Sequence, residues 1–183
     1  NFAGSTDPVA ASQEIVAAGT TVTTPSVPEV STLGDTVTLS ATVQSDAGIP
    51  EGTLEFFDGA TYLGGVSLDA NGTGTLQTSD LNLASNAITA VYTGSNNYSG
   101  STSPVAFTYV QSPTTTMLVT SVNPAVHGQS MTTFISVMGT ANGAATPSGV
   151  VSLYDGEELL ATVNLDSLGN ASWTCTLATG EHS

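Results

Sequence analysis

The stretch Gly52-Thr-Leu-Glu-Phe-Phe-Asp-Gly59 recurs as Gly149-Val-Val-Ser-Leu-Tyr-Asp-Gly156, 97 residues further along the chain. In the first copy, apolar and polar residues alternate before an Asp-Gly pair, which is typical of a half-buried strand that ends in a hairpin turn. Residues 1–8 recur at 97–104, and residues 69–72 recur at 166–169. The agreement of these blocks indicates an internal repeat of about 96 residues.

More segments with alternating apolar and polar residues lie around this stretch. Val37–Val43, Ile88–Tyr92 and Val105–Tyr109 all follow the pattern, and turn signals such as Asn71-Gly72 separate such segments. No segment has a helical period, so each repeat is predicted to fold as a β-sandwich of about seven short strands. The few aromatic residues fall mostly at alternating positions, and we expect them to face the core.

The motifs of the chain resemble those of the bacterial immunoglobulin-like repeat domain. The resemblance is carried by Gly52–Gly59, Leu63-Gly64, Ile88–Gly94 and Asn97–Thr102, and Gly180-Glu181-His182 is similar to the family's Gly-x-His before its sixth strand. It implies an all-β fold of tandem immunoglobulin-like β-sandwiches, each of about seven antiparallel strands. Because the family occurs in arrays of bacterial surface and secreted proteins, the resemblance implies an extracellular or cell-surface location.

The repeat predicts three segments. Residues 1–19 match the last strand of a preceding repeat plus a linker, and residues 20–111 make a complete immunoglobulin-like domain. Residues 112–183 make a second such domain that lacks its last two strands. An open sheet edge is a template for another strand. We therefore expect a neighbouring repeat or an identical subunit, arranged head to tail, to supply those strands, and Asp7–Ala17 resembles such a strand.

The charge balance excludes several classes of partner. The chain has 15 Asp and Glu residues and no Lys or Arg, which gives a net charge of −15. Nucleic-acid affinity comes mainly from Lys and Arg, so we expect no nucleic-acid partner. No apolar run is long enough to span a bilayer, so we expect no membrane insertion. The 22 Ser and 30 Thr residues supply the polar surface instead.

No set of residues in the sequence predicts catalysis. Only His127 and His182 are present as histidines, and we expect them at different strand edges, with His182 packed in a turn. Together with Cys175 they match no zinc-ligand spacing. The chain is therefore predicted not to be an enzyme, with no catalytic, cofactor-binding or metal residues.

Cys175 is the only cysteine, so the chain holds no internal disulfide. It lies two residues from Trp173, which places both side chains on one face of a strand. Trp173 aligns with Leu76 in the repeat, at an inward position. We expect a buried, unreactive thiol beside a core tryptophan.

Calcium is the one metal that the acidic composition favours. Four aspartates stand at predicted hairpin turns, where Asp is also favoured by its bonds to the local backbone. They are Asp58, Asp69, Asp155 and Asp166. No D-x-[DN]-x-[DN]-G loop is present, so we expect these residues to shape turns rather than to bind calcium.

A structural role is the preferred functional prediction: a stalk, spacer or filament module made of stacked repeats. One alternative is an adhesin or carbohydrate-binding module with a glycan or protein ligand, which an exposed aromatic cluster would favour. Another is an accessory domain of a secreted polysaccharide-degrading enzyme. The sequence alone leaves these three open.

Overall fold

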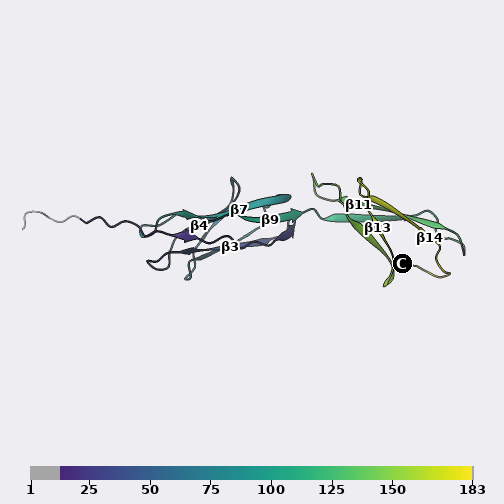
Figure 1. Ribbon diagram of the computed structural model, residues 1–183, viewed down its shortest axis with the longest axis horizontal. Coiled ribbons are helices and arrows are strands. Elements are labelled where there is room, and N and C mark those ends of the chain that lie inside the picture. Colours follow the sequence, from purple (N-terminus) through teal and green to yellow (C-terminus); the bar gives the residue numbers. More distant parts are fainter. Residues whose placement is uncertain (1–12, 183) are drawn as a thin grey trace, which may run out of the picture. The chain divides into compact units, whose positions relative to one another are not determined.

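A computed structural model describes residues 13–182 of the chain (Figure 1). Within this range it contains fourteen β-strands and no helix. The chain forms two compact units, and the second takes in Val30–Asp35 and Asn82–Ala84 as well as the residues from Tyr109 onward. The strands fall into a first β region up to Gln111 and a second from Thr114, and each is described separately.

The first β region has two sheets. Strands β1 (Thr21–Val22), β3 (Val37–Gln44) and β6 (Thr73–Thr78) form one antiparallel sheet in the order β1-β3-β6. The other sheet has the order β2-β9-β7-β4-β5, and β8 pairs with β7. Its strands are β2 (Val30–Thr32), β4 (Thr53–Asp58), β5 (Thr61–Ser67), β7 (Ala84–Tyr92), β8 (Ser101–Thr102) and β9 (Ala106–Gln111).

The two sheets of the first region pack face to face. A methyl group placed on Gly74 in β6 would lie 2.9 Å from Leu54 Cδ2 in β4, so side chains of the second sheet lie directly over the first. The alternation predicted for β3 is confirmed, since its buried and more exposed residues alternate along the strand. Phe56 and Tyr92 are the largest fully buried side chains, and the Tyr92 hydroxyl donates to the Glu51 carbonyl at 2.5 Å.

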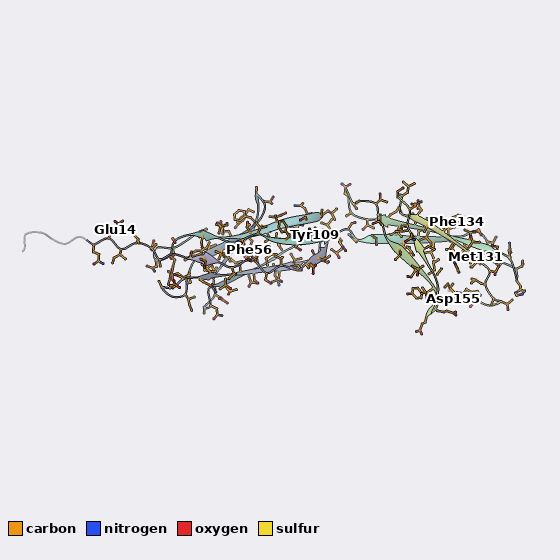
Figure 2. All side chains as sticks on the ribbon, in the orientation of Figure 1. Glu14, Phe56, Tyr109, Met131, Phe134 and Asp155 are labelled. Atoms are coloured by element: carbon orange, nitrogen blue, oxygen red, sulfur yellow. The ribbon has the colours of Figure 1, made fainter. Side chains whose placement is uncertain are left out.

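The prediction of which residues of β9 face the core is wrong. Phe107 and Tyr109 are 61% and 54% exposed, whereas Ala106, Thr108 and Val110 face inward (Tyr109 is labelled in Figure 2). The core already holds Phe56 and Tyr92, and β9 adds small side chains to it. A one-residue shift in phase sends every side chain of a strand to the other face. Three more rings, those of Tyr62, Phe134 and Tyr154, are 53–56% exposed, so the expectation that most aromatics are buried also fails.

The second β region repeats the first half of this pattern. Strands β10 (Thr114–Thr120), β11 (Met131–Gly139) and β14 (Asn170–Cys175) form an antiparallel sheet in the order β10-β11-β14. Strands β12 (Val150–Asp155) and β13 (Glu158–Asn164) form a hairpin. Ile135, Val137 and Leu153 make its small core.

The segment that precedes β1 forms no strand within the described residues. Of the predicted strand Asp7–Ala17, residues 7–12 lie outside the described range. Ile15 and Val16 are 89% and 75% exposed. Ala18 forms an isolated parallel bridge with Tyr98. Its carbonyl accepts the Ser99 N–H at 2.8 Å.

Candidate interaction site

The candidate site is the outer edge of β12, which we define by comparison with β4. Both strands pair with the next strand in the same register, and both have a bulge, between Phe56 and Phe57 in β4 and between Leu153 and Tyr154 in β12. The other edge of β4 pairs with β7 over five residues. Among residues 13–182, no strand pairs with the corresponding edge of β12. No strand of this range therefore blocks that side of Val150–Tyr154 from pairing with a further strand.

The apolar face behind this edge is incompletely covered. Leu54 and Phe56 in β4 are fully buried, whereas Val151, the equivalent of Leu54, is only partly buried and Leu153 is 6% exposed. Trp173 is also only partly buried, and it packs against the cluster of Ile135, Val137 and Leu153. In the first region β7 supplies Ile88, Ala90 and Tyr92 to the core. No described residue fills that role in the second region.

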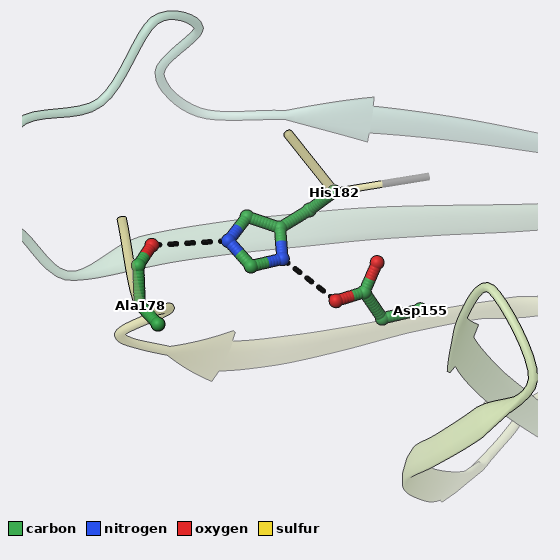
Figure 3. A network of polar contacts seen from close by, with 3 residues as sticks. All are labelled: Asp155, Ala178 and His182. Atoms are coloured by element: carbon green, nitrogen blue, oxygen red, sulfur yellow. Dashed lines mark hydrogen bonds and ion pairs between the residues drawn. The ribbon is translucent and has the colours of Figure 1, made fainter. Parts of the chain in front are cut away.

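Asp155 ends β12 and takes part in a polar network (Figure 3). Its Oδ2 lies 2.7 Å from His182 Nδ1, and His182 Nε2 lies 3.0 Å from the carbonyl oxygen of Ala178. In the first region the equivalent Asp58 instead accepts the backbone N–H of Ala87 in β7, at 2.7 Å. The same aspartate position thus binds a backbone amide where β7 is present and an imidazole in the second region.

The geometry favours the protonated form of His182. Its two ring nitrogens face a carboxylate and a carbonyl, which both accept hydrogen bonds. Both contacts are hydrogen bonds only when both nitrogens carry a proton. The hydrogen bond to Asp155, together with that to Ala178, raises the pKa of His182 above its usual value. His182 does fold back on its own loop through the Ala178 carbonyl, and its side chain is 27% exposed; the pairing with Asp155 is the contact that the sequence did not predict.

The two histidines, which were expected at different strand edges, line the same pocket. His127 and His182 both line an open pocket of about 640 Å³ between the loops 120–129 and 177–182. Residues 13–182 nevertheless hold no group of three His, Cys, Asp or Glu side chains that is arranged to bind a metal.

Cys175 lies at the end of β14, where it pairs with Met131 across the sheet. The thiol is partly buried rather than fully buried as predicted, because no further strand covers this end of the region within the described residues. Burial raises its pKa. A raised pKa keeps the sulfur in the thiol form, which is the unreactive form.

Two of the predicted turn aspartates have the same local geometry. Asp69 Oδ1 accepts the N–H groups of Asn71 and Thr73, each at 2.8 Å. Asp166 Oδ1 accepts those of Leu168 and Asn170 at 2.8 and 2.9 Å. Each carboxylate therefore closes its own turn, as the sequence predicted. The bonds from Thr73 and Asn71 lower the pKa of Asp69.

The described part of the chain has no helix that is long and apolar enough to cross a membrane. A search of curated protein sequences finds no match to the chain. A scan against protein-family models matches residues 21–111 to the bacterial Ig-like domain, group 3, and finds no enzyme domain. The matched residues hold β1 to β9, which are the two packed sheets of the first region. The chain thus carries a bacterial Ig-like domain of group 3 at residues 21–111, as its motifs predicted.

Proposed function

We propose that this chain is a spacer module of a surface or secreted bacterial protein, in which Ig-like domains follow one another and bear load. The observation that carries the proposal is the repetition of one structural unit. The hairpin β12–β13 has the register and the bulge of β4–β5, and the Asp166 turn has the bonding of the Asp69 turn. What the two regions share is turns and core positions, which are the parts that determine folding.

The surface chemistry supports a passive role. The exterior is rich in hydroxyl groups, and several of them pair across strands. Thr42 and Thr73 lie 2.8 Å apart between β3 and β6, and Thr132 and Thr174 lie 2.8 Å apart between β11 and β14. Such pairs stabilise a sheet through its exposed face without requiring charge. A net charge of −15 keeps such a module soluble.

We further propose that the second region becomes a full Ig-like domain when two strands are added to it. One of them would pair with the free edge of β12, as β7 pairs with β4. It would also bring a backbone amide to Asp155, as Ala87 does to Asp58. A following repeat or another subunit is a suitable donor, because either carries strands of the same alternating pattern.

Single-molecule force spectroscopy on the full chain tests the load-bearing role. A spacer domain is expected to unfold in one cooperative step. Unfolding of residues 21–111 should lengthen the chain by about 30 nm, from the 3.3–3.6 Å that an extended residue spans. Gradual extension at low force, with no discrete step of this length, would contradict a load-bearing role for the matched domain.

A further inference from the structure

The outer face of the β4–β5 hairpin carries two aromatic rings that the core does not use. Tyr62 in β5 is 56% exposed, and Phe57, opposite it in β4, is partly buried. Their ring centroids are 5.5 Å apart and the planes meet at 64°, which is an edge-to-face arrangement. Such a pair holds the exposed ring in a defined orientation. Tyr62 therefore presents a fixed aromatic surface to solvent.

A carboxylate side chain lies next to this ring. Gly65 pairs with Glu55 across the hairpin. A methyl group placed on Gly65 would lie 2.9 Å from the Tyr62 hydroxyl oxygen and 3.5 Å from Glu55 Cγ. The glycine thus leaves a notch that is bordered by the tyrosine hydroxyl and by the Glu55 side chain. An aromatic face beside a carboxylate is the combination that binds an ammonium or guanidinium group, since both attract a positive charge.

We propose that Tyr62, Phe57 and Glu55 form a docking site for a Lys or Arg side chain of a partner protein. The charges of the chain identify the occupant. The 183 residues contain no Lys or Arg, so neither these residues nor a second copy of them can fill the site with such a cation. Its net charge of −15 repels polyanions and attracts basic segments. The occupant that these charges favour is therefore a basic segment outside these 183 residues, and we assign it to a partner protein.

The second hairpin supplies an internal comparison. Its equivalent positions hold Ser152 in place of Glu55, Leu159 in place of Tyr62 and Thr162 in place of Gly65. It retains only an exposed ring at Tyr154. The second hairpin keeps the backbone register of the first but lacks the carboxylate, the edge-to-face tyrosine and the glycine notch. The site is therefore a property of the first domain and is not required by the fold.

The test is an NMR titration of the full ¹⁵N-labelled chain with a synthetic Arg-Gly-Ser repeat peptide, at low and high salt. A peptide with citrulline in place of every arginine is the neutral control. We expect saturable shifts centred on β4 and β5 with the arginine peptide, weakened by salt, and none with the citrulline peptide. Glu55→Gln and Tyr62→Leu should each weaken binding about two- to five-fold, while Tyr62→Phe retains it.

Two further variants distinguish a specific binding site from non-specific electrostatic attraction to the acidic chain. Gly65→Ala keeps every charge but displaces the Tyr62 ring, so it should weaken binding. Glu158→Gln removes an equal charge from the exposed face of the other hairpin and should not. Equal losses from Glu55→Gln and Glu158→Gln would overturn the proposal. So would the absence of saturable shifts, equal binding of spermidine, or shifts at these residues with cellohexaose but not with the arginine peptide.

Discussion

Trp173 holds the position in β14 that Leu76 holds in β6. Leu76 lies opposite Leu39 in β3, and Trp173 lies opposite Thr133 in β11. The turns that precede both residues bond in the same way, with the Gly72 and Gly169 carbonyls accepting the Val43 and Val137 N–H groups at 2.8 Å. Both side chains are partly rather than fully buried. The equivalence predicted from the repeat is confirmed, and the extent of burial is less than predicted.

The first prediction concerns Leu76. Its methyl groups lie against Gly64 in β5, 3.0 Å from the position of an added methyl group, so they connect the two sheets of the first domain. Leu76→Ala should destabilise that domain by about 1–3 kcal/mol, the lower part of the range for core leucines because the side chain is partly exposed. Urea unfolding followed by far-UV circular dichroism measures this. Gln77→Ala, on the exposed face of the same strand, is the control. A loss below about half a kcal/mol would show that the contact is unimportant.

The second prediction concerns Asp69. The lowered pKa of this group means that the folded state favours its ionised form. Its contribution to stability is therefore present above the unfolded pKa of about 3.8 and is lost as pH falls through the lower folded pKa. Asp69→Asn, which does not titrate, should reduce the melting temperature at pH 6 more than at pH 2.5. An equal reduction at both values would contradict the role of the carboxylate charge.

The third prediction concerns calcium. In the Asp69 and Asp166 turns one carboxylate oxygen already accepts two backbone N–H groups. No group of three acidic, His or Cys side chains that could hold a metal occurs among residues 13–182. Calcium needs six to eight oxygen ligands. Thermal melts in calcium chloride and in a chelator should therefore superimpose. A stabilisation of tens of degrees by calcium would assign these turns to metal binding instead.

The sequence predicted the parts of the fold that depend on local chemistry. Alternation along Val37–Val43 specified a half-buried strand, and the Asp-Gly pair after Phe57 specified a hairpin. Alternation alone left the phase of β9 undetermined, because Val105, Phe107 and Tyr109 alternate with Ala106, Thr108 and Val110, and both sets are compatible with a core. The choice depends on the volume left beside Phe56 and Tyr92, which is a tertiary quantity.

The fourth prediction concerns His182. Because folding raises its pKa, the contribution to stability is fully present below the unfolded pKa of about 6.5 and is lost as pH rises through the folded pKa. His182→Gln should lower the urea midpoint of the second region at pH 5.5 and leave it unchanged at pH 9. Fluorescence of Trp173, the only tryptophan of the chain, reports on this region alone. Asp155→Asn should abolish the difference between the two pH values, and a difference that survives it would locate the effect elsewhere.

The side-chain contacts at the candidate sites depend on strand neighbours and strand register, which the sequence did not specify. The spacing of Asp58 and Asp155 in the repeat marks an equivalent position, yet one carboxylate binds a backbone amide and the other an imidazole. Their difference follows from which strand lies beside them. The approach of Tyr62 and Glu55 to Gly65 was not predicted, because it depends on the register across the hairpin. The alternation of β4 does place Glu55 on the outer face, away from the buried Phe56.

The fifth prediction concerns the free edge of β12. Amides of β4 are held between β5 and β7, whereas β12 pairs only with β13 among residues 13–182. In hydrogen-exchange mass spectrometry, peptides that cover β12 should exchange much faster than peptides that cover β4, because half of the β12 amides lack a strand partner in this range. Trp173 should likewise be quenched by acrylamide, since it is partly exposed.

The same edge can be tested by the opposite change, in which strands that match residues 84–111 are added to the C-terminal end of the chain. If the second region is an incomplete Ig-like domain, such an extension should slow amide exchange in β12 to the rate seen in β4 and should shield Trp173 from acrylamide. It should also remove the pH dependence of stability that His182 causes, because a backbone amide then replaces the imidazole at Asp155. Three independent readouts then change together. Protection of β12 in the 183-residue chain itself, in a monomer by analytical ultracentrifugation, would contradict the open edge. An extension that leaves β12 exchanging freely would show that the region does not accept strands in the way that β4 accepts β7.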